Sequence, residues 1–220
     1  MWRFFFALFS LTRFTIHASL LDRPLVVGFI LSMFTDDIFT AMYIAVFFEL
    51  LWIDIIPAGT FIPPNAIFCV VATICLMEIF GLAHTSQILP LMIMTIPIAF
   101  LSSWLEGVQR TGQNKNYNVI LQQTRKTPAK YRPDLMIRTS VIQSFLIYLI
   151  TGLLGIYLLL GIFSFIHIYL PLENIIQWPH LILIASISAL AALRIKKAYI
   201  SLMVGMVLIA AYLGKDLLPL

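Results

Sequence analysis

The chain has 220 residues, of which 61% are hydrophobic and 11% charged, and its formal net charge is +4. Soluble domains are about 45–50% apolar, so this composition excludes an ordinary soluble fold and leaves too little polar sequence for a separate catalytic domain. The long continuous apolar runs argue against a β-barrel, whose strands alternate apolar and polar side chains. We expect an all-α polytopic membrane protein, because lipid forces backbone amides to bond within helices.

The apolar segments of the N-terminal half differ in length. The first is interrupted early by Arg13 and lacks a cleavage site, which favours a retained short membrane segment over a signal peptide. A full membrane span needs about 20 residues. Residues 25–34 supply about half of that, whereas residues 38–56, 66–82 and 88–105 are about long enough to cross.

The segments of the C-terminal half are also uneven. Residues 140–170 exceed one straight crossing, so we expect a tilted, broken or projecting helix. Residues 181–193 and 198–213 are short and flank a basic turn, which predicts a cytoplasmic end or the tip of a re-entrant hairpin. In total we expect about six to eight transmembrane or half-length helices, with broken or re-entrant segments. The breaks are predicted at the prolines Pro57, Pro63, Pro64, Pro90, Pro97, Pro171 and Pro179.

A basic region separates two membrane halves. Residues 109–138 contain Arg110, Lys115, Arg125, Lys126, Lys130, Arg132 and Arg138. The positive-inside rule predicts a cytoplasmic loop here, between an N-terminal membrane half (1–108) and a C-terminal membrane half (139–220) of one integral membrane domain. The loop could dock a cytoplasmic protein or anionic lipid headgroups equally well. Few aromatic residues interrupt it, which argues against nucleic-acid binding.

Four carboxylates lie in otherwise apolar sequence, namely Asp36, Asp37, Glu49 and Asp54. A charged side chain at bilayer depth costs roughly 2.5–3.5 kcal/mol on insertion scales. These groups must therefore sit at membrane edges, be protonated or line a polar cavity. One aspartate is well placed to cap the helix that follows, and Asp36 is as good a candidate for this as for any other role.

Glu49 is the carboxylate that is hardest to explain by packing, because it lies deep in the run 38–56 with no cation three or four residues away. A helix places Ala41 and Ala45 on the same face as Glu49. The alanines allow close helix approach, so Glu49 and Trp52 are expected to face the protein interior. A carboxylate beside an aromatic plane suits a sugar, and it suits a proton relay as well.

The chain lacks the motifs of catalysis and cofactor binding. It has no phosphate-binding P-loop, nucleophile elbow or zinc-binding histidine pair, and its histidines are scattered. Cys69 and Cys75 are about 240° apart around a helix and are expected to pack as small buried hydrophobes. We therefore expect no catalytic residue, metal site or cofactor in this chain.

An ordered set of short motifs occupies residues 20–66. In chain order the motifs are Arg23-Pro24-Leu25, Asp37, Glu49-Leu50 and Pro64-Asn65. This set resembles the enzyme IIC component of the mannose/fructose/sorbose-type sugar phosphotransferase systems (PTS), with its R-P-L entry, L-G-D turn, L-E-[LM] helix and P-D break. Several family positions differ here: Asp36 replaces the turn glycine, and Asn65 replaces the last aspartate. Residues 41–48 replace a glycine-rich stretch before the glutamate, and Asp54 falls where the family tends to have glycine.

The resemblance implies a permease subunit of the bacterial cytoplasmic (inner) membrane that moves a hexose or related sugar inward. It implies an oligomeric complex with a IID-type membrane subunit and with cytoplasmic IIA and IIB proteins, which carry the phosphohistidines. It also implies sugar recognition by Asp37, Glu49 and Asn65, to which we add Trp52 from its place beside Glu49. Two alternatives stay open: a proton- or ion-coupled secondary transporter, and a divergent assembly or sensory subunit that does not transport.

Overall fold

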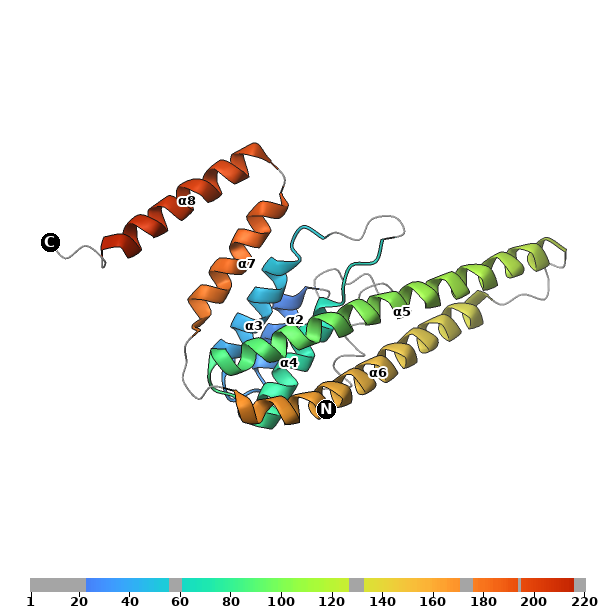
Figure 1. Cartoon of the computed structure of the whole chain (residues 1–220). Coiled ribbons are helices and arrows are strands. Elements are labelled where there is room, and N and C mark those ends of the chain that lie inside the picture. The colour runs from blue at the N-terminus through green and yellow to red at the C-terminus, as the bar shows by residue number, and fades with distance from the viewer. Residues whose placement is uncertain (1–22, 56–60, 127–132, 171–175, 194, 216–220) are drawn as a thin grey trace.

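A computed structural model describes residues 23–55, 61–126, 133–170, 176–193 and 195–215, and within these ranges the chain is helical with no strand (Figure 1). The helices are α2 (Pro24–Ser32), α3 (Ile38–Leu51), α4 (Ala66–Phe80), α5 (Thr85–Lys126), α6 (Pro133–Ile166), α7 (Trp178–Ala192) and α8 (Lys196–Lys215), with a short 3-10 turn η2 (His167–Tyr169) after α6. The predicted all-α class and helix number are confirmed. The predicted N-terminal membrane segment around Arg13 lies outside the described residues.

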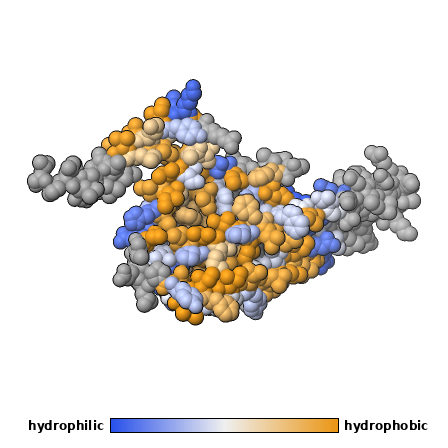
Figure 2. Space-filling view, in the orientation of Figure 1, coloured by the Kyte–Doolittle hydropathy of each residue, from blue (hydrophilic) through white to orange (hydrophobic). Residues whose placement is uncertain are grey.

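Two helical segments are long and apolar enough to cross a membrane, at Thr85–Asn114 and Arg138–Tyr169. Helices α3, α4 and α7 are apolar but shorter. The short α7 agrees with the short segment predicted at 181–193, whereas residues 38–56 and 66–82 were predicted to be about long enough to cross, and α3 and α4 are shorter than that because the helices end at Leu51 and Phe80. Apolar residues cover most of the face seen in Figure 2, and hydrophilic residues gather at the turn between α7 and α8. Such a surface is expected where lipid takes the place of water.

Helix α4 forms the centre of the fold. Every residue from Ile67 to Met77 is buried, and a helix that is apolar and buried all round belongs in a core. Helices α2, α3, α5 and α6 pack around it. Ala41 and Ala45 of α3 are fully buried, as their spacing predicted. Gly28 of α2 lies so close to Ala45 that an added Cβ would overlap that side chain.

The prolines have two different outcomes. Pro24 and Pro179 lie in the first turns of α2 and α7, where the missing N–H costs nothing. Pro90 and Pro97 were predicted to mark breaks, and this is wrong, because both lie inside the continuous helix α5. Membrane-protein helices tolerate such prolines when neighbouring helices, hydroxyl side chains or small local adjustments satisfy the freed backbone groups.

Helices α5 and α6 form a long hairpin that extends beyond the central bundle (Figure 1). Most of the basic region is helical, since residues 109–126 continue α5 and residues 133–138 begin α6. The side of the membrane on which this region lies stays a prediction. At the other end of the chain, α7 packs on α3, with Trp178 stacked on Tyr43 at 5.3 Å between ring centroids. Helix α8 contacts α7 near the turn that joins them, where the Tyr199 hydroxyl donates to the Ala191 carbonyl at 3.2 Å.

Candidate functional site

Asp37 caps the start of α3. Its carboxylate accepts hydrogen bonds from the backbone N–H of Thr40 at 3.1 Å and from the Thr40 hydroxyl at 2.6 Å. The cap predicted for Asp36 is therefore formed by its neighbour, because only the residue directly before the first helical turn can reach Thr40. The hydrogen bond from the Thr40 hydroxyl is the main reason that the pKa of Asp37 lies below its ordinary value. The side chain of Asp37 is otherwise exposed.

Glu49, in the last turn of α3, reaches across to the start of α2. Its Oε1 lies 3.2 Å from Nη1 of Arg23, and its Oε2 accepts a hydrogen bond from the backbone N–H of Leu25 at 3.3 Å. Arg23 is the N-cap residue of α2 but makes no cap with its own side chain. Glu49 therefore supplies the negative group that the free N–H groups at a helix start favour. The cation that sequence spacing could not locate lies 26 residues away.

The exposure of this pair is unequal. The Glu49 side chain is 19% exposed and that of Arg23 is 59% exposed. An ion pair with one partner so open to solvent contributes at most about 1 kcal/mol. Glu49 is thus held in a defined position without being locked by a strong buried pair.

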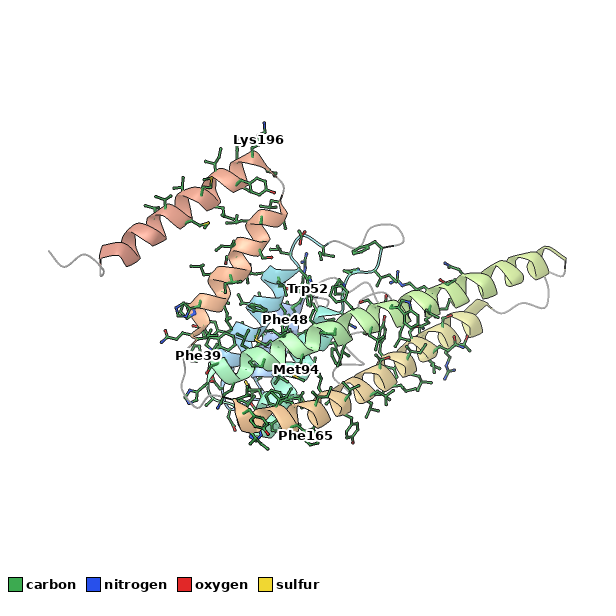
Figure 3. All side chains as sticks on the ribbon, viewed as in Figure 1. Phe39, Phe48, Trp52, Met94, Phe165 and Lys196 are labelled. Carbon is green, nitrogen blue, oxygen red and sulfur yellow. The ribbon has the colours of Figure 1, made fainter. Side chains whose placement is uncertain are left out.

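Trp52 ends α3 one turn beyond Glu49. Its ring stacks on that of Phe48 at 5.6 Å between centroids and 18° between planes. Both residues are labelled in Figure 3, where they lie close together on α3. The indole is partly buried. The stack fixes one face of the ring, and it keeps the aromatic surface near the Glu49 end of the helix.

Asn65 links the start of α4 to α5 through hydrogen bonds. The side chain is fully buried: its Oδ1 accepts a hydrogen bond from the Phe68 N–H at 3.2 Å, and its Nδ2 donates to the Ser102 hydroxyl at 3.2 Å. The Asn65 backbone N–H donates to the Ala99 carbonyl at 3.3 Å. The Ser103 hydroxyl also donates to the carbonyl of Pro63 at 2.8 Å. Hydrogen bonds to α4 and α5 therefore satisfy polar groups of the Pro63-Pro64-Asn65 segment, so this break between helices does not expose them.

Sequence reasoning did not identify Ser102 and Ser103. The only signal was a pair of hydroxyl residues in an otherwise apolar stretch of α5. Serine side chains in membrane helices commonly bond back to their own helix, so this pair alone could not indicate a contact with residues 63–65. Only the packing of α4 against α5 makes that contact visible.

The four predicted sugar-contacting residues fall at two ends of one bundle. Asp36 and Asp37, just before α3, lie close to Glu78 near the end of α4, so α3 and α4 run antiparallel. Asn65 at the start of α4 therefore lies at the end of the bundle that carries Glu49 and Trp52. Asp37 is about 18 Å from that end at about 1.5 Å per helical residue. One hexose cannot contact both ends in this arrangement.

The Glu49 end offers groups suited to a neutral hydroxylated molecule. Glu49, Arg23 and Trp52 supply a carboxylate, a guanidinium and an aromatic face at the end of α3, while the Asn65 amide and two serine hydroxyls are buried in the contact between α4 and α5. Among the described residues, no group of three or more His, Cys, Asp or Glu side chains is placed to hold a metal. Cys69 and Cys75 are free and buried, in agreement with the packing role predicted for them.

These features define the class of the molecule as an all-helical integral membrane protein with polar groups concentrated at helix ends. A family model described as "PTS system sorbose-specific IIC component" matches residues 2–177, which is most of the chain. The chain therefore belongs to this family of sugar-specific membrane components of the phosphotransferase system. The predicted family is confirmed, and the match extends far beyond the motifs at residues 20–66. No curated protein and no solved structure matches the chain.

Proposed function

We propose that this chain is the sugar-translocating subunit of a phosphoenolpyruvate-dependent phosphotransferase system. It moves a hexose or related sugar inward across the bacterial cytoplasmic membrane for phosphorylation by partner subunits. The observation that carries the proposal is the family match over residues 2–177. The partly exposed carboxylate of Glu49 and the aromatic ring of Trp52 one turn beyond it support the proposal.

Glu49 is the residue we assign first to sugar recognition. Each carboxylate oxygen accepts one hydrogen bond from the protein, and a carboxylate has about four acceptor sites in all. The remaining sites can accept sugar hydroxyls while Arg23 and Leu25 hold the group in place. Trp52 supplies an apolar ring face beside it, which suits the C–H face of a pyranose.

Asn65 and Asp37 take different roles in this proposal. Asn65 accepts and donates within the protein and is fully buried, so it shapes the site, and the sugar reaches its remaining N–H and lone pair only when the segment before α4 moves away from α5. Asp37 lies at the opposite end of α3, and its carboxylate meets the sugar at a separate point of the path. The sugar would then contact the Asp37 end and the Glu49 end of α3 one after the other rather than at the same time.

The partners in the proposal are a IID-type membrane subunit and cytoplasmic IIA and IIB proteins, assembled as an oligomeric complex. Phosphoryl transfer takes place on those cytoplasmic partners, and the IIC chain contributes no catalytic histidine. The basic region 109–138 faces the cytoplasm and is available to a IIB-type protein. Anionic lipid headgroups are the competing partner for the same charges.

Uptake of labelled sugar in cells that supply the partner subunits tests the proposal. Uptake should depend on phosphoenolpyruvate, and Glu49→Gln should reduce it at least tenfold, because the amide replaces an acceptor by a donor. Asp54→Asn is the matched control, since Asp54 is an exposed carboxylate just beyond α3. Unchanged uptake in Glu49→Gln would remove Glu49 from the site. Uptake that follows a proton gradient and ignores the phosphoryl donor would indicate a secondary transporter instead.

A further inference from the structure

A polar stripe continues along α5 beyond the serines that bond the α4 break. Glu106, Arg110 and Gln113 follow Ser102 and Ser103 at spacings of three or four residues, which places them along one helix face. The apolar part of α5 before them, residues 85–105, is about 31 Å long at about 1.5 Å per residue. This equals the thickness of the hydrocarbon core, so Glu106 lies where the helix leaves it, next to the basic region.

A cavity of about 100 Å³ opens at this point between α5 and α6. Its polar lining comes from both helices: Glu106, Gln109, Arg110 and Gln113 of α5, with Ser140 and Ser144 of α6. The Gln109 amide donates to the Ser144 hydroxyl at 2.7 Å and so bridges the two helices beside the cavity. Two apolar membrane helices thus enclose a polar space that hydrophobic packing does not require.

The charges in the cavity select a neutral ligand. Glu106 is only 2% exposed, and its Oε1 lies 2.8 Å from Nη2 of Arg110. The guanidinium is therefore neutralised within the site, and a bound phosphate would face the Glu106 carboxylate as well. A molecule with hydroxyl groups, which both donate and accept, fits this lining better than an anion does.

Gln113 supplies an independent sign of a ligand. Its Nε2 is buried and has no hydrogen-bond acceptor among the described residues. A buried donor left in this state costs about 1–3 kcal/mol. An acceptor that enters the cavity would satisfy this amide and recover that cost.

We propose that this cavity is a second sugar site, at which one hydroxylated edge of the sugar binds as it leaves the membrane toward the basic region. The inference rests on the proposed function. A volume of about 100 Å³ corresponds to about three waters, so the cavity takes an edge of the ring rather than the whole ring. The rest of the sugar lies in the opening beside Arg110, whose side chain is 35% exposed.

The first test uses Gln113→Met in the full complex, with uptake of labelled L-sorbose and D-mannose as the readout. Methionine keeps the length of the side chain and removes the unpaired donor, so the thermal unfolding midpoint should stay the same or rise. The apparent KM should rise about tenfold for the transported sugar. Val108→Met is the control, because Val108 is an exposed residue of the same helix outside the cavity lining. An unchanged KM in Gln113→Met would overturn the second site.

The second test separates this inference from the proposed function. Ser140→Cys places a thiol in the cavity, while Cys69 and Cys75 are buried. L-sorbose or D-mannose should slow its labelling by a small methanethiosulfonate reagent at least threefold. Labelling that no sugar slows, in a complex with normal phosphoenolpyruvate-dependent uptake, overturns the second site alone. Protection by sugar without phosphoenolpyruvate dependence supports the site and refutes the phosphotransferase role. Protection by phosphatidylglycerol vesicles, but not by sugar, shows a lipid headgroup site and overturns the inference.

Discussion

The two ends of α3 use a carboxylate in opposite ways. At the start of the helix, Asp37 bonds Thr40 three residues later, so its role is local and could be satisfied in an isolated peptide. At the other end, Glu49 bonds Arg23 and Leu25, which belong to a different helix. A local cap needs only α3 to form, whereas the Glu49 contact needs α2 and α3 to pack together. The Glu49 end therefore depends on the tertiary fold and can change with it.

The largest expected effect comes from separating α2 and α3. In Gly28→Ala the new Cβ would overlap the side chain of Ala45, so the two helices must move apart at a cost of about 1–3 kcal/mol. The thermal unfolding midpoint in detergent should fall. Gly161→Ala is the control, because a Cβ there would meet open space, and alanine stabilises a helix by about 0.5–1 kcal/mol over glycine. Equal midpoints for the two variants would show that α2 and α3 do not approach closely.

The next effect concerns the start of α4. Asn65→Ala removes the helix cap and leaves the Ser102 hydroxyl without its donor. The expected loss of unfolding free energy is about 1–2 kcal/mol. Asn65→Asp, which introduces the residue typical of the family, keeps the capping oxygen and should lose less. A larger loss for the aspartate than for the alanine would contradict the cap as the main role of Asn65.

The Asp37 end should show a smaller and pH-dependent effect. Asp37→Ala removes a local cap worth about 0.5–2 kcal/mol, whereas Asp37→Asn can still accept from Thr40. Because the pKa of Asp37 is lowered in the folded protein, its contribution is present above the unfolded pKa of about 4 and is lost as the pH falls through the folded pKa. Unfolding midpoints of wild type and Asp37→Asn between pH 5 and pH 2 should converge. Curves that stay parallel over this range would refute the titration of Asp37.

The smallest effect is the coupling between Arg23 and Glu49. A double-mutant cycle with Arg23→Gln and Glu49→Gln should give a coupling free energy of unfolding of no more than about 1 kcal/mol, because Arg23 is 59% exposed. The same variants should differ far more in sugar uptake, with Glu49→Gln the more damaging. A coupling well above 2 kcal/mol would mean that Glu49 is mainly a structural residue.

Sequence patterns could predict features that depend on local chemistry or on composition. The all-α class follows from the apolar runs, and the buried Ala41 and Ala45 follow from helical spacing. The continuity of α5 through Pro90 and Pro97 was not predictable, because proline alone favours a break and only surrounding structure can satisfy the freed carbonyls.

The site residues show the same division between local and long-range contacts. A cap by one aspartate could be predicted beside this helix start, although the pattern did not decide between Asp36 and Asp37. The partners of Glu49 and Asn65 lie 26 and 37 residues away in sequence. No helical spacing relates such positions, so these contacts depend on how α2 packs on α3 and how α4 packs on α5.

The most direct test of sugar binding at the Glu49 end is equilibrium binding of radiolabelled D-mannose and L-sorbose to the purified complex. The measurement compares wild type with Glu49→Gln and with Asp54→Asn, without phosphoenolpyruvate, so that binding is separated from phosphorylation. Glu49→Gln should raise the Kd of the bound sugar at least tenfold, whereas Asp54→Asn should leave it unchanged. A Kd that is the same in all three proteins would exclude Glu49 from the sugar site.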